Sequence, residues 1–339
     1  MVGLVFIVFS FLLAIFAYFI APDNSPFANQ MHLELSKIDP GTKVLFLKKK
    51  KKFVSPPTSW TDQLIYGDIK SFTLIPISSY EYQGARIIYT PYNAFNKKEM
   101  LITDLYLDCG KSVFEKVFYL GTDRYGRDLL SRLIIGTRIS LSIGFIAVLI
   151  SLLIGISLGL ISGYYGGLID RSIMWLINVV WSVPTLLMVI AISLALGRGF
   201  WQVFIAVGLT MWVELARVVR GQVMGLKEMD YIKAAKMIGF SDFRIIFRHI
   251  LPNITSSIIV ISAANFASAI LIEAGLSFLG IGTQAPIPSW GGMIKNHYAY
   301  IILDKAYLAI APGLAIVFLV LAFMLVGNML REKLQVKNT

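Results

Sequence analysis

Six long apolar blocks run along the chain, and polar segments separate them. A helix that crosses the hydrocarbon core of a bilayer needs about 20 mainly apolar residues, and each block is close to that length. The pattern therefore predicts an all-α membrane protein with six transmembrane helices. The predicted spans are Val2–Ile20, Ile139–Ile161, Ile173–Leu196, Phe200–Val218, Ile254–Leu279 and Tyr307–Leu330.

Composition agrees with this pattern. Of the 339 residues, 56% are hydrophobic and 15% are charged. Soluble globular chains carry about 25% charged residues, so a water-soluble core is excluded. The net charge of +11 does not indicate a nucleic-acid partner, because the basic residues lie between the apolar blocks rather than on one soluble face. Contact with anionic membrane lipid is the expected reason for this basic excess.

Residues 1–20 are interpreted as a retained transmembrane anchor. They lack the basic start and the small-residue cleavage site of a signal peptide. A basic segment upstream of Met1 remains a further hypothesis. The polar segment that follows, residues 21–119, predicts a small strand-containing insertion, because apolar and polar residues alternate over residues 72–77 and 85–89. Its basic run from Lys48 to Lys52 is interpreted as a solvated face, with lipid or substrate contact as the alternative.

The basic residues predict the orientation in the membrane. Lysine and arginine gather between the fourth and fifth spans and again after the sixth, and such clusters favour the cytoplasm. This places both termini and the tail of residues 331–339 in the cytoplasm, and the insertion of residues 21–119 on the extracytoplasmic side. A basic cluster close to the second span runs against this orientation. It comprises Arg124, Arg127, Arg132 and Arg138.

Two features of the spans concern packing and bending. Gly155, Gly159 and Gly163 recur every four residues, which gives one smooth helix face that a neighbouring backbone can approach closely. Such a face serves either static packing or sliding as a translocation path opens. Pro184 lies inside the third span and predicts a kink there, because proline removes a helical hydrogen bond.

Two acidic residues fall inside the predicted spans. A carboxylate at membrane depth requires a partner or a wet cavity. Arg217 follows Glu214 by one helical turn, which predicts a local ion pair. Glu273 has no nearby cation in the sequence, so Glu273 and Pro184 are the candidates for lining a translocation path.

The sequence carries no pattern typical of catalysis. It contains no GxxxxGK[ST] phosphate loop, so the chain itself is not predicted to hydrolyse ATP. His32, His249, His297 and the single cysteine, Cys109, do not have metal-ligand spacing. We therefore predict no catalytic residue, no metal site and no cofactor in this chain, and we do not expect it to be an enzyme.

The charged loop of residues 219–253 predicts two short helices. A helical pattern runs to Ile238 and Gly239 ends it. Ser241 then caps a second helix, which we expect to end before Pro252.

This hairpin carries the candidate docking residues. Ala234 and Ala235 are predicted to leave a flat surface for close contact. Arg244 and Arg248 share a helix face that suits an acidic groove. The alternative is an amphipathic hairpin that lies on lipid.

The spacing of this loop resembles a known family. Ala234-Ala235, Gly239 and Leu251-Pro252 are similar to the loop by which binding-protein-dependent ABC importer permeases contact their ATPases. Lys233 departs from that motif, which often begins with glutamate. Further similar stretches are LGTDRYGRDLLSR (120–132), GTRIS (136–140), GYYGGLID (163–170), EAGLSFLG (273–280) and PSWG (288–291). From Leu120 onward the chain resembles the C-type permease subunit of dipeptide, oligopeptide and nickel ABC importers.

The resemblance implies a type I importer permease in a bacterial inner membrane. It implies a pre-helix segment at residues 120–138 and a type-1 transmembrane domain at residues 139–330. The implied partners are a homologous second permease, two cytoplasmic ATPase subunits that bind the ATP, and an extracytoplasmic solute-binding protein. Short peptides are the implied substrate. Nickel or another small solute, an ion-gradient-driven transporter and a membrane-embedded enzyme remain alternatives.

Overall fold

The computed structural model describes residues 2–51, 59–107, 111–197 and 199–335. Lys52, Cys109 and residues 336–339 of the predicted tail lie outside these ranges. Two compact units divide the chain. The helical unit comprises Met1–Phe11, Ile139–Gln284 and Gly313–Thr339, and the strand unit comprises Leu12–Arg138 and Ala285–Pro312.

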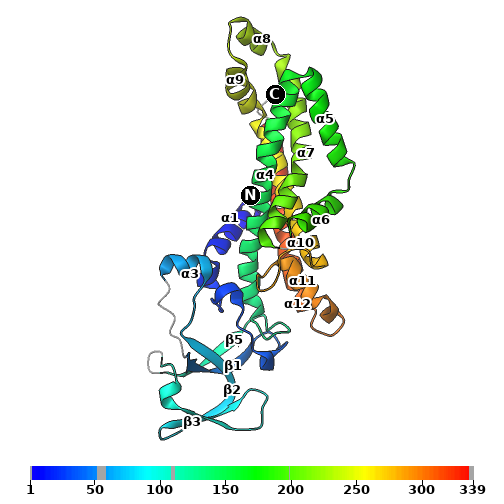
Figure 1. The fold of residues 1–339 in the computed structure, drawn as a ribbon. Coiled ribbons are helices and arrows are strands. Elements are labelled where there is room, and N and C mark those ends of the chain that lie inside the picture. Colours follow the sequence, from blue (N-terminus) through cyan, green and yellow to red (C-terminus); the bar gives the residue numbers. More distant parts are fainter. Residues whose placement is uncertain (1, 52–58, 108–110, 198, 336–339) are drawn as a thin grey trace. The chain divides into compact units, whose positions relative to one another are not determined.

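Long apolar helices form the helical unit (Figure 1). Two helices, α4 and α12, and the end of α1 continue into the strand unit, and a π-helical turn, Ile246–Ile250, joins α9 to α10. The helices are α1 (Val2–Ile15), α4 (Leu129–Tyr165), α5 (Gly167–Trp181), α6 (Thr185–Leu196), α7 (Phe200–Lys227), α8 (Asp230–Met237), α9 (Asp242–Ile245), α10 (Leu251–Leu279) and α12 (Tyr307–Gln335).

Among the described residues, four helices are long and apolar enough to cross a membrane. They cover Leu129–Tyr165, Trp201–Lys227, Asp242–Leu279 and Tyr307–Lys333. The pair α5 and α6 counts as a fifth span if the two helices cross together. The predicted first span is interrupted at Phe16, and α1 has 14 residues, fewer than the about 20 that a span requires. The described part of the chain is therefore mostly helical, with four to five candidate spans.

The kink predicted at Pro184 is a complete break. Helix α5 ends at Trp181, α6 begins at Thr185, and the two axes differ by 91°. Pro184 precedes α6 with an extended ψ of 127°. Proline lacks the N–H that would continue α5, and it also drives the preceding residue, Val183, away from the helical region. The two effects together stop the helix instead of bending it.

The strand unit contains a five-stranded antiparallel sheet in the order β4-β3-β2-β1-β5. The strands predicted at residues 72–77 and 85–89 are confirmed as parts of β2 and β3. The strands are β1 (Thr42–Lys50), β2 (Phe72–Gln83), β3 (Arg86–Pro91), β4 (Lys98–Leu101) and β5 (Val113–Phe118). The helices of this unit are α2 (Ala17–Ile20), α3 (Trp60–Tyr66) and α11 (Trp290–His297), with 3-10 turns at Pro26–Ala28, Leu33–Leu35, Ile102–Asp104 and Tyr298–Ile301.

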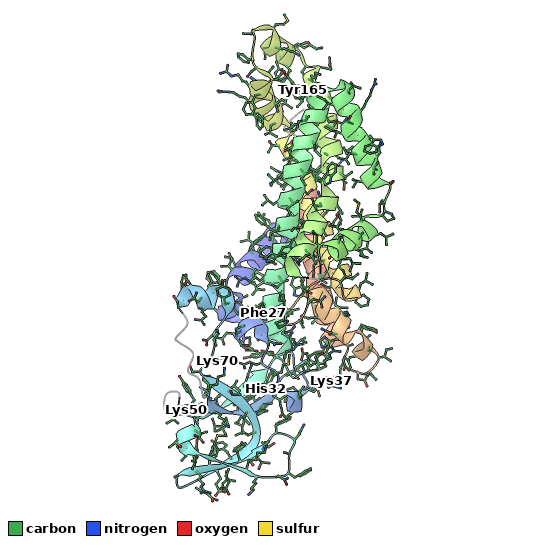
Figure 2. All side chains as sticks on the ribbon, in the orientation of Figure 1. Phe27, His32, Lys37, Lys50, Lys70 and Tyr165 are labelled. Atoms are coloured by element: carbon green, nitrogen blue, oxygen red, sulfur yellow. The ribbon has the colours of Figure 1, made fainter. Side chains whose placement is uncertain are left out.

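The basic run ends strand β1. Val44 and Phe46 pack into one apolar cluster and Leu47 into another, so apolar side chains anchor the strand on both faces. The Lys48 ammonium lies over two aromatic rings, while Lys50 is exposed and is labelled in Figure 2. The lysines therefore form the solvent-exposed end of a strand whose middle is buried.

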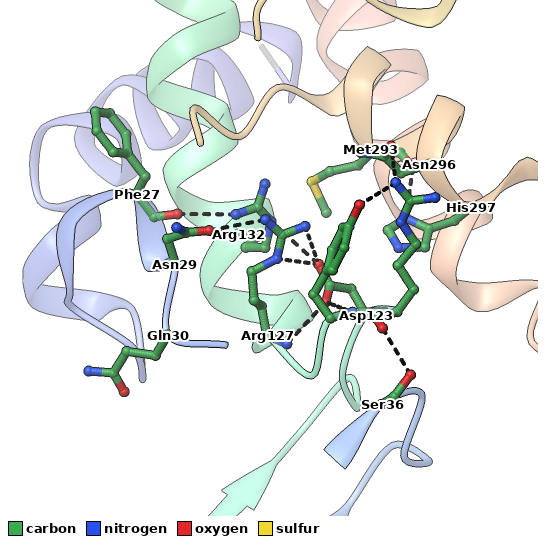
Figure 3. Close-up of polar contacts among 12 residues, drawn as sticks. Phe27, Asn29, Gln30, Ser36, Asp123, Arg127, Arg132, Met293, Asn296 and His297 are labelled. Atoms are coloured by element: carbon green, nitrogen blue, oxygen red, sulfur yellow. Dashed lines mark hydrogen bonds and ion pairs between the residues drawn. The ribbon is translucent and has the colours of Figure 1, made fainter. Parts of the chain in front are cut away.

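Asp123 organises a buried polar network in the strand unit (Figure 3). Its Oδ2 accepts hydrogen bonds from Arg127 Nε and Nη2, both at 2.7 Å, and Arg132 Nε lies 3.8 Å away. Its Oδ1 accepts from the backbone N–H groups of Tyr125 and Arg127. Arg127 also donates to the Asn29 side chain. These contacts tie the 120–132 motif to the segment that follows α2.

Burial shifts the pKa of two titratable groups near this network. Burial raises the pKa of the Asp128 carboxyl, although the Ser131 hydroxyl donates to it. Burial also lowers the pKa of His297, whose Nδ1 lies 2.7 Å from the Met293 carbonyl oxygen. Because that carbonyl can only accept, Nδ1 carries the proton of the neutral ring.

We predict that Asp123→Asn destabilises the chain by about 3–5 kcal/mol, because it leaves two buried guanidinium groups without their carboxylate. Glu115→Gln is the matched control, since its ion pair with Lys43 is exposed and is worth about 0–1 kcal/mol. Thermal unfolding of the two purified variants measures the difference. Equal unfolding midpoints would show that the network contributes little to stability.

Candidate functional site

A cavity of about 390 Å³ lies among α5, α6, α7 and α10 of the helical unit. Half of its lining is apolar, from Trp181, Met211, Val213, Leu271 and Ile272. The other half is polar, from Thr185, Thr210, Glu214, Asn265 and Ser268. Glu214 is the one charged side chain among the described residues that line it. The cavity therefore combines an apolar wall with neutral hydrogen-bonding groups and a single carboxylate.

The ion pair predicted between Glu214 and Arg217 is wrong. No contact within 4 Å joins them in the described part of the chain. The Arg217 guanidinium instead stacks 3.6 Å from the ring centre of Trp181 and donates to Asn178 Oδ1 at 3.1 Å. The flat guanidinium gains a cation–π contact with Trp181 in this position. A pair with Glu214, one turn earlier on the same helix, would not provide that contact.

The two predicted path residues lie beside the cavity and not among the residues that line it. Glu273 is buried, and its Oε1 accepts a hydrogen bond of 2.6 Å from Ser277. Pro184 is exposed at the break between α5 and α6, next to the lining residue Thr185. Both residues are therefore neighbours of lining residues in the sequence, while the lining itself comes from positions that no local pattern distinguishes.

The three glycines of α4 face α7. An added Cβ would lie 2.9 Å from the Trp212 carbonyl oxygen at Gly155 and 2.7 Å from the Ala216 carbonyl oxygen at Gly159. At Gly163 it would lie 2.8 Å from another backbone carbonyl oxygen of α7. These separations are shorter than real Cβ contacts, so a side chain at any of the three positions requires α4 and α7 to separate.

The predicted hairpin begins as expected and ends differently. Gly239 has a φ of +88°, which favours glycine, and the Ser241 hydroxyl accepts from the Arg244 N–H as a helix cap. The prediction that the second helix ends before Pro252 is wrong, because α9 continues through the π-turn into α10. Pro252 stands in the first turn of α10, and the wider π-turn accommodates its missing N–H.

One face of the hairpin is buried against α4 and α7. Ile232, Ala235 and Ile245 belong to an apolar cluster with residues of those two helices. Each buried isoleucine stabilises this packing by about 1.5–3 kcal/mol. The expectation that both alanines form a flat exposed surface is therefore corrected, since Ala235 is buried and only Ala234 is exposed.

Polar contacts reinforce the attachment of the hairpin. The Tyr164 hydroxyl donates to Asp242 Oδ1 at 2.6 Å, which joins the end of α4 to the start of α9. Lys227 Nζ donates to the Tyr164 carbonyl oxygen, also at 2.6 Å. Arg220 of α7 makes a bidentate pair with Asp170 of α5, at 2.6 and 2.7 Å. The hairpin and the ends of α4, α5 and α7 are thus tied together.

The opposite face of the hairpin is exposed and apolar. Met237 is 85% exposed, Ile238 75% and Phe243 70%. Figure 1 shows α8 and α9 at one end of the helical unit. Four exposed cations of the same segment, which we call its basic rim, are Lys233, Lys236, Arg244 and Arg248, and Lys233 pairs with Glu228 at 3.1 Å. Large exposed apolar side chains beside basic residues are typical of a binding face.

The predicted docking residues divide between these two faces. Lys233, Ala234, Arg244 and Arg248 are exposed, whereas Leu251 and Pro252 belong to the first turn of α10. The exposed apolar residues of the hairpin were not predicted from the sequence. The sequence indicates them by two consecutive large apolar residues, Met237 and Ile238, which do not belong to the periodic apolar face of the helix.

Comparison with known proteins gives consistent matches. Residues 155–336 match the family model described as binding-protein-dependent transport system inner membrane component. The chain is 42% identical over 219 residues to the glutathione transport system permease protein of Pectobacterium atrosepticum, covering 65% of this chain and 72% of that protein. It is 41% identical over 219 residues to the dipeptide transport system permease protein of Alkalihalophilus pseudofirmus, with the same two coverages.

Two further similarities extend this picture. The oligopeptide transport system permease protein of Bacillus subtilis is 39% identical over 222 residues, covering 66% of this chain and 72% of that protein. The inward-facing methionine ABC transporter is a solved structure that matches with a TM-score of 0.50 at 17% identity. The match covers 61% of this chain and 97% of the solved chain. At that identity the structural likeness shows the fold alone.

We predict that Gly159→Ala lowers stability by about 1–3 kcal/mol, because the added methyl group overpacks the contact with α7. Gly221→Ala is the control, since nothing lies within 4 Å of its added Cβ and alanine favours a helix by about 1 kcal/mol. Thermal unfolding in detergent compares the two variants. A Gly159→Ala variant as stable as the Gly221→Ala variant would contradict tight packing of α4 on α7.

Proposed function

The chain belongs to the family of binding-protein-dependent transport system inner membrane components, and on that premise we propose that it is the C-type permease subunit of an ATP-driven importer of short peptides. The single observation that carries the proposal is the exposed apolar face of the α8–α9 hairpin with its basic rim. This face suits a partner protein, and the buried side of the same hairpin is fixed to helices of the membrane domain.

The substrate class follows from the relatives. Dipeptide, oligopeptide and glutathione permeases are all about 40% identical to this chain. These solutes share an ammonium group, carboxylates and amide bonds. The mixed lining of the cavity suits such a solute, because neutral polar groups can bind amides while the apolar wall contacts side chains. Nickel or another small solute is the alternative.

The proposed assembly contains a homologous second permease, two cytoplasmic ATPase subunits and an extracytoplasmic solute-binding protein. The ATP binds to the ATPase subunits, so this chain requires no cofactor or metal and is not an enzyme alone. The chain then provides half of the translocation path in a bacterial inner membrane.

The proposed mechanism transmits motion from the hairpin to the cavity. Helix α9 continues through the π-turn into α10, which contributes Asn265, Ser268, Leu271 and Ile272 to the cavity lining. A partner that moves the hairpin therefore displaces α10, together with the ends of α4 and α7 that are bonded to it. Rigid-body movement of this kind opens the path alternately to each side. In this scheme the α4–α7 glycine face packs statically, since its separations leave no space for sliding.

The proposed topology has six spans and both termini in the cytoplasm. It requires residues 1–20 to cross the membrane as an anchor and places residues 21–119 outside. The basic rim of the hairpin supports a cytoplasmic position for residues 219–253, because lysine and arginine are retained on that side. Residues 139–330 form the transmembrane type-1 domain in this proposal, with residues 120–138 as its lead-in.

We predict that Phe243→Asp reduces ATP-dependent uptake at least tenfold and lowers the amount of ATPase subunit retained by the purified permease. A carboxylate in the apolar centre of a docking face costs about 2 kcal/mol or more. The measurement is uptake of a radiolabelled dipeptide by the reconstituted assembly, with the retained subunits quantified by mass spectrometry.

Phe243→Leu is the matched control, because it keeps an apolar side chain at the same exposed position. It should retain both uptake and subunit binding. Uptake by the Phe243→Asp variant at the level of the Leu variant would contradict the docking role. Uptake that survives ATP depletion and collapses with an ionophore would indicate the secondary-transporter alternative.

A further inference from the structure

The cavity among α5, α6, α7 and α10 has one uncompensated charge. Glu214 is exposed to it, and no cation among the described residues lies within 4 Å of that carboxylate. A carboxylate at membrane depth is costly to desolvate, so its retention in a path requires a cationic partner or water. Glu214 therefore requires water or a cationic partner that is not among the described residues near it.

The nearest cation in sequence is held elsewhere. Arg217 stacks on Trp181 and donates to Asn178, and these two contacts fix its guanidinium away from Glu214. Arg220, one turn further along α7, is fixed by its bidentate pair with Asp170. Both arginines of this part of α7 thus have their own partners, and neither is available to neutralise Glu214.

The rest of the lining is uncharged. Asn265 is buried in the helical unit and lines the cavity, and its side chain makes no hydrogen bond with another described residue. Ser268 is exposed on the same side of α10. These groups offer neutral donors and acceptors, so the electrostatic preference of the cavity comes from Glu214. That preference favours a cationic group.

We propose that Glu214 binds the ammonium group of the transported solute, the free α-amino group of a short peptide, as the solute passes through this half of the path. The inference rests on the proposed function, since it names the chemical group that the same cavity recognises. The peptide ammonium would otherwise enter a low-dielectric region without its hydration shell. A charge-assisted hydrogen bond to a carboxylate offsets that desolvation.

The test compares a free dipeptide, Ala-Ala, with its N-acetylated form in the complete reconstituted transporter. Uptake is measured at saturating peptide and saturating binding protein in the wild type and in Glu214→Gln. The ratio of free to acetylated uptake is taken for each protein. Any selection by the binding protein is common to both proteins and cancels when the two ratios are divided.

The wild-type ratio divided by the Glu214→Gln ratio is the quotient, and we expect it to be about ten. The variant loses a hydrogen bond between charged groups, and it loses it only for the free peptide. Glu214→Asp should restore most of the discrimination. Ser268→Ala is the matched control, since it changes the same lining without changing its charge, and its quotient should stay near one. A quotient near one for Glu214→Gln overturns the proposal.

A second readout does not depend on uptake. Glu214 of the wild-type complex is modified with a water-soluble carbodiimide and glycine ethyl ester, and the loss of the unmodified Glu214 peptide is quantified by mass spectrometry, so that an adduct with Ala-Ala itself also counts as modification. Millimolar Ala-Ala should slow the modification several-fold more than N-acetyl-Ala-Ala. Equal protection by both, or none, overturns the proposal. Failure of the proposed function is distinguishable, because the wild type would then import neither peptide in an ATP-dependent manner.

Discussion

The close approach of α4 and α7 is the constraint on which the rest of the helical unit depends. Three glycines bring the two backbones together, and the added Cβ separations of 2.7 to 2.9 Å leave no room for side chains. This contact creates the surface on which Ile232 and Ala235 of the hairpin are buried. It also holds the end of α4 where the Tyr164 hydroxyl reaches Asp242. The hairpin is positioned as a consequence of this backbone packing.

The same arrangement joins the exposed face of the hairpin to the cavity. The hairpin leads directly into α10 through the π-turn, while α7 contributes Glu214 and Thr210 to the cavity. A movement of the exposed hairpin face therefore reaches the cavity through two helices without crossing a flexible loop. Packed helices of this kind move as rigid elements, because close-packed interiors do not deform continuously.

The sequence predicts much of this fold because several of its signals are local. Gly239 and Ser241 define the turn and the cap of the hairpin by their own backbone and side-chain chemistry, and alternation identifies β2 and β3. The errors concern contacts between elements. Ala235 is buried because of where α4 and α7 lie, and Arg217 pairs with Trp181 because α5 ends beside α7. The break at Pro184 comes from local proline chemistry, so the sequence located this feature and underestimated it as a kink.

Purification of the tagged chain from its native membrane in mild detergent tests the central claim most directly, when mass spectrometry identifies what remains bound. The account predicts a second, homologous permease and ATPase subunits in the complex, with a solute-binding protein that identifies the substrate. Recovery of this chain alone, still competent for uptake in vesicles without ATP, would contradict the account.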